Sequence, residues 1–294
     1  VRDLSRLQRA FHGGDFVVHA AALKQVPALE FNPFEAVQTN IIGTQNVISA
    51  AIDQGVEKVL LISTDKAANP ANLYGATKLC AERLCVAANN YSAGKTRFSA
   101  VRYGNVLGSR GSLLTIIEKQ RLKGEITLTH VEMTRFWITL DHGVDLVFMA
   151  LENMVGGETF IPKAPSMKVK DLLTSLAPEC TLKVTGIRPG EKMHEVLVTS
   201  EEARRTREFE EHYVILPEFI VGNAHEHHAH GKMFDAGSAY TSDTNERWLD
   251  ENTVILAIGA LRIANKKGII RNLSAAETLG SATLIMTDKT GTLT

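Results

Sequence analysis

A short apolar run that ends in polar residues constrains the fold of this chain more than any other feature. Residues 58–64 (KVLLIST) predict a buried parallel strand, because such strands are apolar on both faces. Asp65 and Lys66 follow directly, so we expect them just past the carboxyl end of that strand. Open α/β sheets bind their ligands at this edge, so the pair is a candidate for chemistry.

A tyrosine and a lysine four residues apart open the helix that follows. At this spacing Tyr74 and Lys78 share one helical face. A lysine ammonium near a phenol favours the phenolate, which would make the tyrosine a usable base near neutral pH. An isolated Tyr-x-x-x-Lys match is more often a packed tyrosine with a solvated lysine. Here the preceding strand with its Ser-Thr end favours the catalytic interpretation.

The composition is that of an ordinary globular protein with little net charge. The 294 residues are enough for one large domain or two, with 44% hydrophobic and 22% charged residues. A net charge of -1 gives no electrostatic reason to expect nucleic acid or an anionic membrane as a partner. Three cysteines without metal-ligand spacing favour reduced thiols and a cytoplasmic location. No stretch is apolar for long enough to cross a bilayer.

Apolar periodicity predicts alternating helices and strands along the chain. We expect helices at 3–14, 33–54, from 74, at 113–123, 141–154, 168–177 and 193–198, and strands at 15–19, 58–64, 98–103 and 181–184. This alternation predicts a doubly wound parallel α/β sheet of the Rossmann type, with a small α/β substrate lobe from about residue 125. The charged residues 200–211 predict a solvated face.

Three loops contain residues suited to a ligand. The glycine-rich stretch 104–112 runs into a helix and would suit a diphosphate, although such turns are as often plain connections. Arg188 can pair with phosphate in bidentate fashion, and Glu191 can take a ribose hydroxyl, so both are substrate-clamp candidates. Residues 224–230 (AHEHHAH) are dense in histidine. We prefer a flexible loop to a metal site there, because no partner cysteine or carboxylate cluster is evident.

Six strings occur in the order and spacing of a known family. They are 19–24 (HAAALK), 63–70 (STDKAANP), 74–78 (YGATK), 102–106 (RYGNV), 133–139 (MTRFWIT) and 186–192 (GIRPGEK). Together they resemble the extended short-chain dehydrogenase/reductase family. Within it they are most similar to the inverting UDP-N-acetylglucosamine 4,6-dehydratases of the pseudaminic acid pathway. The likeness runs from the first residue to about residue 249.

The resemblance implies a nicotinamide cofactor, NADP with NAD as the alternative, and a UDP-sugar substrate. It implies catalytic roles for Asp65, Lys66, Tyr74 and Lys78. The cofactor would contact Ala20, Ala21, Lys24, Thr39, Tyr74 and Lys78. The substrate would contact Thr64, Asn105, Arg110, Thr129, Arg135, Arg188 and Glu191. Asn40, inside a predicted helix, would lie near the active site. The family forms homo-oligomers and its activity needs no metal.

The implied reaction is dehydration of the sugar at C4 and C6 with inversion at C5. Tyr74, tuned by Lys78, would take the C4 hydroxyl proton while the C4 hydride moves to the nicotinamide. Lys66 would remove the C5 proton and later return it from the other face, and Asp65 would assist loss of the 6-hydroxyl as water. A UDP-sugar 4-epimerase of the same family is the alternative. The Asp-Lys pair favours elimination, because an epimerase needs no second acid–base pair.

The two ends of the chain depart from the family pattern. The fingerprint G-x-x-G-x-x-G, expected after the first strand of this fold, is absent. We therefore expect a chain truncated inside the cofactor domain, with poor affinity for the dinucleotide. Residues 255–294 resemble the phosphorylation site of P-type cation ATPases, with Asp288 in the phosphorylated position.

These features predict three parts. Residues 1–124 would form a truncated dinucleotide-binding domain, 125–250 mainly a substrate-binding lobe, and 251–294 an ATPase-like tail. The other ATPase domains are missing, so we expect a fusion or assembly product without ATPase activity. A non-catalytic remnant is the third interpretation, and it predicts unfolding without a cooperative transition.

Overall fold

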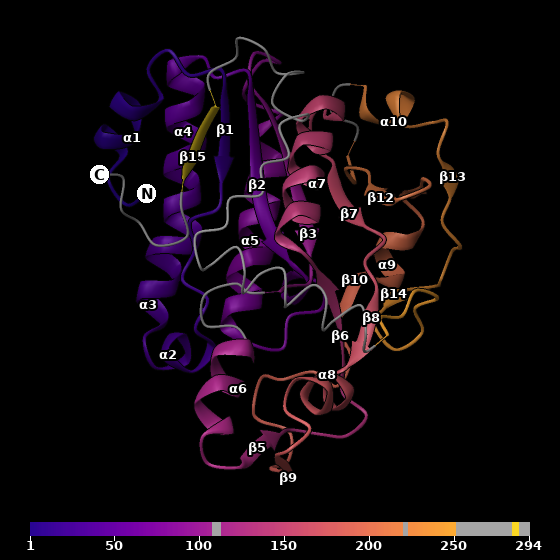
Figure 1. The fold of residues 1–294 in the computed structure, drawn as a ribbon. Coiled ribbons are helices and arrows are strands. Elements are labelled where there is room, and N and C mark those ends of the chain that lie inside the picture. Colours follow the sequence, from indigo (N-terminus) through magenta and orange to yellow (C-terminus); the bar gives the residue numbers. More distant parts are fainter. Residues whose placement is uncertain (108–112, 220–222, 251–283, 288–294) are drawn as a thin grey trace.

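An eight-stranded, mostly parallel sheet forms the centre of the molecule. A computed structural model describes residues 1–107, 113–219, 223–250 and 284–287 (Figure 1). The strand order is β13-β11-β12-β7-β3-β2-β1-β15. The strands are β1 (Phe16–His19), β2 (Lys58–Thr64), β3 (Arg97–Tyr103), β7 (Thr159–Pro162), β11 (Thr206–Glu208), β12 (His212–Ile215), β13 (Lys232–Met233) and β15 (Leu284–Thr287). From β15 to β7 neighbouring strands run parallel, and β12, β11 and β13 continue the sheet antiparallel.

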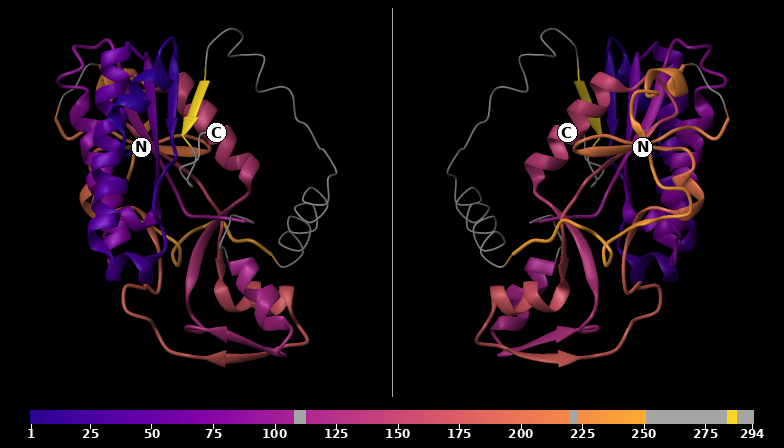
Figure 2. Two further views of the ribbon diagram at one scale, coloured as in Figure 1. Left: turned by 90° about the vertical axis from the view of Figure 1, so that its left-hand side faces the viewer. Right: turned by 90° about the vertical axis from the view of Figure 1, so that its right-hand side faces the viewer.

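Helices cover both faces of this sheet, as the doubly wound prediction requires (Figure 2). The helices of this part of the molecule are α1 (Leu4–Phe11), α2 (Val26–Phe31), α3 (Pro33–Ala36), α4 (Gly43–Gln54), α5 (Leu73–Ala88), α7 (Leu140–Asn153), α9 (Ser200–Ala203) and α10 (Ala224–His227). Alternate residues of the strands point to opposite faces. Val59 and Leu61 pack with α1, α4 and α5, whereas Leu60 and Val101 pack with α7. The α/β fold class predicted from the sequence is confirmed.

A smaller lobe lies beyond the carboxyl ends of β2 and β3 (Figure 2). It contains α6 (Leu113–Arg121), α8 (Val169–Leu176), β4 (Asn105–Val106), β5 (Glu125–Leu128), β6 (Thr134–Ile138), β8 (Ser166–Lys168) and β9 (Thr181–Val184). Ile126, Leu128 and Leu173 are buried in its core. The chain returns to the main sheet for β7, β11 and β12. The chain first enters the lobe directly after β3, so β4 and α6 already belong to it before residue 125. The division into domains at 125 stays a prediction.

One predicted helix is wrong. Residues 193–198 contain the strand β10 (Val196–Val198), which pairs antiparallel with β14 (Tyr240–Thr241). Two β-branched residues in a segment this short suit a half-buried strand, and helical periodicity cannot be judged over six residues. Leu197 and Val198 pack against Ile161 of the main sheet.

Little of the ATPase-like tail is described. Residues 284–287 form β15, parallel to β1, with Phe16 opposite Leu284 and His19 opposite Thr287. Asp288 lies outside the described residues. Among the helices that the structure describes, none is long and apolar enough to span a membrane.

Candidate active site

A cleft of about 420 Å³ lies where the main sheet meets the lobe. Strands β1, β2 and β3 point their carboxyl ends toward it, the position where such sheets bind ligands. The predicted site residues that line it are Ala20, Lys24, Thr64, Lys66, Tyr74, Lys78, Asn105, Thr129, Arg135, Arg188 and Glu191. Ala21, Thr39 and Asp65 are outside this lining, and Arg110 lies outside the described residues. The cleft therefore brings together most of the predicted set.

A tight turn after β2 presents Asp65 and Lys66. The turn is one 3-10 segment, Asp65–Ala67, whose start is capped by the Thr64 hydroxyl, which accepts from the Lys66 amide at 3.4 Å. Asp65 is fully buried, and its Oδ1 accepts from Thr64 Oγ1 and from Lys66 Nζ, each at 2.9 Å. Three consecutive side chains thus form one hydrogen-bonded unit at the strand end.

Gly75 allows helix α5 to approach this turn. A Cβ at this position would lie 2.2 Å from the Lys66 carbonyl oxygen, so only glycine fits without a shift. Asn72 caps α5 by accepting from the Gly75 amide at 2.9 Å, and its Nδ2 donates to Gly190 O at 2.8 Å. The start of α5, which carries Tyr74, is therefore fixed against both the Lys66 turn and the loop 186–192.

Burial is the largest influence on the pKa of Tyr74. Burial raises the pKa of Tyr74 to about 12, while Lys66 and a hydrogen bond with Thr64 act in the opposite direction. Because burial outweighs Lys66, the phenol is the main form of Tyr74 near neutral pH in this structure. Lys78 Nζ donates to Ile62 O at 2.6 Å, and burial lowers the Lys78 pKa to about 8. The tuning of Tyr74 by Lys78 stays a prediction.

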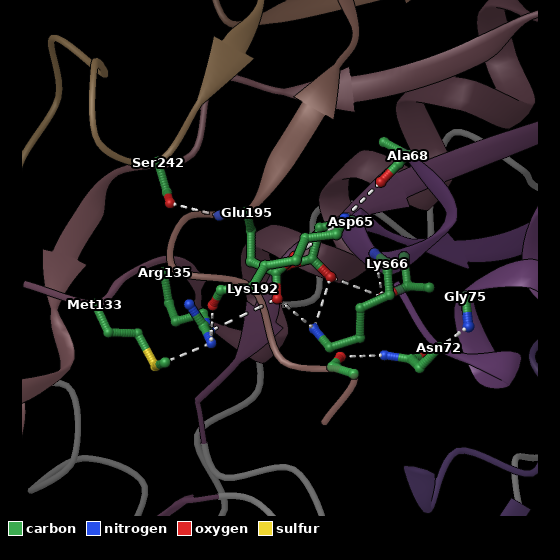
Figure 3. A network of polar contacts seen from close by, with 12 residues as sticks. Asp65, Lys66, Ala68, Asn72, Gly75, Met133, Arg135, Lys192, Glu195 and Ser242 are labelled. Atoms are coloured by element: carbon green, nitrogen blue, oxygen red, sulfur yellow. Dashed lines mark hydrogen bonds and ion pairs between the residues drawn. The ribbon is translucent and has the colours of Figure 1, made fainter. Parts of the chain in front are cut away.

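The structure adds one carboxylate that the sequence analysis missed. Glu195 is 2% exposed, and its Oε1 lies 3.4 Å from Lys66 Nζ and 3.7 Å from Arg135 Nε (Figure 3). Its Oε2 lies 3.7 Å from Lys192 Nζ. The sequence signal was only an acidic residue soon after the string 186–192, and nothing in that string distinguishes it.

The pKa values of Asp65, Lys66 and Glu195 are shifted in different directions. Burial raises the pKa of Asp65. The negative charge of Glu195 raises this pKa further, whereas the Lys66 ammonium lowers it without reversing the shift. Burial alone would lower the pKa of Lys66, but Asp65 and Glu195 outweigh it and raise that pKa. Burial would raise the pKa of Glu195, but Lys66, Arg135 and Lys192 together lower it. At neutral pH, Lys66 is an ammonium, Glu195 is a carboxylate, and Asp65 is the carboxyl group that most readily takes a proton.

Arg135 contacts the backbone of the neighbouring loop. Its Nη1 donates to Thr134 O at 2.7 Å and Met193 O at 3.1 Å, and its Nη2 donates to Lys192 O at 3.0 Å. These bonds fix the segment that carries Glu195. Contact of Arg135 with substrate phosphates stays a prediction, as do the substrate contacts of Asn105, Thr129, Arg188 and Glu191.

Asn40 holds the loop that follows β1. The predicted helix 33–54 is helical but contains a π-helical segment, Val37–Ile42. There the buried Asn40 side chain accepts from Leu23 N at 2.8 Å and donates to Leu23 O at 2.9 Å and Thr77 Oγ1 at 3.0 Å. It therefore fixes the loop with Lys24 against α5. Thr39 instead accepts from Arg2 Nε at 2.9 Å, so its cofactor role stays a prediction.

The histidine-rich segment forms a short helix where we expected a flexible loop. Residues 224–227 are α10, and the buried His228 has its Nε2 3.3 Å from Glu158 Oε1. Within the described part of the chain, no group of three or more His, Cys, Asp or Glu side chains could hold a metal.

Comparison with known proteins assigns the family. Residues 1–217 match the family described as Polysaccharide biosynthesis protein, and the chain belongs to it. The inverting UDP-N-acetylglucosamine 4,6-dehydratase of Campylobacter jejuni (subsp. jejuni serotype O:23/36, strain 81-176) is 47% identical over 267 residues, which cover 87% of this chain and 79% of the relative. This confirms the resemblance predicted for the first 249 residues. The ATPase resemblance of the tail stays a prediction.

One further relative and one solved structure are also similar to this chain. The UDP-glucose 4-epimerase of Rickettsia rickettsii is 42% identical over 221 residues, covering 73% of this chain and 65% of the relative. The X-ray structure of Pen from Bacillus thuringiensis is 38% identical, with a TM-score of 0.77, covering 90% of this chain and 79% of that structure.

Proposed function

We propose that this chain removes water from UDP-N-acetylglucosamine across C5 and C6, with oxidation at C4 and inversion at C5, giving a UDP-4-keto-6-deoxy sugar. One observation carries the proposal: the cleft combines two acid–base centres, Tyr74 on α5 and Lys66 after β2, and Lys66 is hydrogen-bonded to the buried Asp65 behind the cleft lining. The inverting dehydratase of Campylobacter jejuni, 47% identical, supports the same reaction.

The cleft suits the nicotinamide end of a dinucleotide. Ala20 and Ala22 line it just after β1, and small side chains there permit close approach of a cofactor. Lys24 and the buried Lys78 line the same cleft and would hold the cofactor. When bound, the nicotinamide would supply a hydride acceptor for C4 and a hydride donor for C6. We propose NADP, with NAD as the alternative.

The pair Asp65–Lys66 can generate acid and base together. A proton shift along their 2.9 Å hydrogen bond converts ammonium and carboxylate into amine and carboxylic acid. The amine then removes the C5 proton, which the adjacent 4-keto group acidifies, while the acid protonates the departing 6-hydroxyl. This step releases water and restores the original charges. Lys66 afterwards delivers its proton to the opposite face of C5.

Thr64 links the two centres. Its hydroxyl donates to Asp65 Oδ1 at 2.9 Å, and Thr64 lowers the pKa of Tyr74. We propose that the proton that Tyr74 takes from the C4 hydroxyl returns through Thr64 and Asp65 to Lys66. Every proton and hydride is then accounted for, with one water released in each cycle.

Replacement of Lys66 tests the assignment. Lys66→Ala keeps Tyr74 and should still reduce the nicotinamide with UDP-N-acetylglucosamine, although more slowly, because the cation that favours the Tyr74 phenolate is gone. It should slow both C5 exchange in deuterated water and water loss by about 10²-fold or more. Lys168→Ala, which removes a surface lysine paired with Glu132, is the matched control and should keep wild-type rates. Normal C5 exchange in the Lys66 variant would show that another group is the base.

The 4-epimerase alternative has its own support and its own product. The Rickettsia rickettsii epimerase is 42% identical. An epimerase returns the hydride to C4 and releases no water. Mass spectrometry of the product therefore separates the two functions, because an epimer has the mass of the substrate. A pseudaminic acid pathway and a homo-oligomer follow from the resemblance to the dehydratases and stay predictions.

A further inference from the structure

We propose that Glu195 is a positioning residue for this reaction, whose negative charge keeps Lys66 an ammonium and holds it at the cleft wall. The consequence for catalysis rests on the proposed function, whereas the effect on Lys66 does not. The two can therefore be tested separately.

Two hydrogen bonds with Ser242 fix the backbone of Glu195. Its amide donates to Ser242 Oγ at 2.9 Å, and its carbonyl accepts from the Ser242 amide at 2.9 Å. Ser242 Oγ in turn lies 2.7 Å from Thr134 Oγ1. Ser242 is fully buried and Glu195 directly precedes β10. The Glu195 backbone is thus anchored on Ser242, just after β14, and through it on Thr134 of β6, both separate from the Asp65–Lys66 turn.

The contacts of the carboxylate differ from those of a structural carboxylate in the same chain. Glu202 receives two guanidinium bonds from Arg102, at 2.8 and 3.0 Å, and caps α9. Glu195 faces Lys66, Arg135 and Lys192 at 3.4 to 3.7 Å, and its buried Oε2 accepts no hydrogen bond within the described residues. It therefore acts mainly through charge, at a distance where a buried charge is only weakly screened.

Every titratable or charged neighbour of Lys66 enters this balance. Asp65 comes from its own turn, Tyr74 from α5, Arg135 from β6, and Glu195 from the segment before β10. Arg135 and Lys192 oppose protonation of Lys66, so without Glu195 the Asp65 carboxylate alone would face three cations. With Glu195 present, two carboxylates, Asp65 and Glu195, face the three cations Lys66, Arg135 and Lys192. The amine form of Lys66 is then reached by transfer to Asp65, and the ammonium form is ready to protonate C5.

Selective acylation of Lys66 measures this directly in the full chain. The rate of acetylation by acetic anhydride depends on the amine fraction, and peptide mass spectrometry gives it for each lysine. Lys66 has a side-chain exposure of 26%, which leaves it accessible from the cleft. At pH 8, Glu195→Gln should raise the Lys66 rate at least tenfold relative to a surface lysine such as Lys168. It should also move the pH profile of C5 exchange at least one unit toward acid.

Two variants separate charge from structure. Glu195→Asp keeps the charge and should stay within about threefold of the wild-type Lys66 rate. Glu202→Gln removes a different buried carboxylate and should leave Lys66 labelling unchanged, even where it lowers stability. If Glu195→Gln does not fold, Glu195→Ala replaces it in the same measurement.

The outcomes are distinct. Unchanged Lys66 labelling in folded Glu195→Gln, or equal labelling in the Gln and Asp variants, overturns the proposal. A labelling increase in a chain that releases no water from UDP-N-acetylglucosamine supports the charge role of Glu195 and rejects the proposed function instead.

Discussion

Replacing Gly75 by alanine should separate the two acid–base centres. In the structure a Cβ on Gly75 would lie 2.2 Å from the Lys66 carbonyl oxygen and 3.1 Å from Pro70 Cβ. Cβ atoms do not approach other atoms closer than 3.0 Å, so the turn and the helix must part by at least 0.8 Å. The nearest atoms are backbone, which cannot rotate away. The displacement therefore reaches Lys66 and Tyr74.

The size of the effect follows from this displacement. A misplacement of about 1 Å in a catalytic group can cost about 10²-fold in rate. Overpacking of this kind typically costs about 1–3 kcal/mol of stability, partly offset by the better helix propensity of alanine. We therefore expect Gly75→Ala to fold, with a lower unfolding midpoint, and to lose about 10²-fold in kcat for water release.

Gly143→Ala is the matched control. Gly143 lies in α7, and a Cβ there would meet Ile138 Cδ1 at 3.5 Å, an ordinary contact. This variant should gain about 0.5–1 kcal/mol and keep wild-type activity. Urea unfolding and product mass spectrometry measure both variants. A Gly75→Ala protein as active and as stable as the wild type would refute the argument that glycine is needed for this approach.

Two further predictions concern buried charge. Arg102 is 1% exposed and binds both Glu82 and Glu202, so Arg102→Met should cost about 3–5 kcal/mol in urea unfolding, because two carboxylates lose their cation. A triple variant with both glutamates changed to glutamine should recover most of that loss, and no recovery would contradict the charge argument. Burial lowers the pKa of His19 from 6.5 to about 3, so its contribution is complete above pH 6.5 and declines as the pH falls toward 3. Between pH 6.5 and about pH 5, the wild type should lose about 2 kcal/mol more than His19→Gln, and parallel curves would rule this out.

The sequence predicted the parts of the site that are close together in the chain. Asp65, Lys66 and Tyr74 belong to one strand–turn–helix unit, so local pattern and spacing place them together. Glu195 reaches Lys66 only because the chain returns from the lobe before β10. A contact between residues this far apart in the sequence cannot be predicted from local sequence patterns. Charge patterning fails in the same way for Glu202. Its charged neighbourhood predicted a solvated face, yet Arg102 from the sheet buries it.

The position of β15 shows that backbone hydrogen bonding alone can add a strand to this sheet. The sequence predicts that residues 255–294 come from a different protein family, yet residues 284–287 pair parallel with β1. A parallel edge offers unpaired N–H and C=O groups, which any strand-forming segment can satisfy without matching side chains. Parallel strands share one carboxyl edge, so β15 ends on the same side of the sheet as His19 and Thr64. Residues 284–287 therefore cover the β1 edge through their backbone, whatever the origin of that sequence.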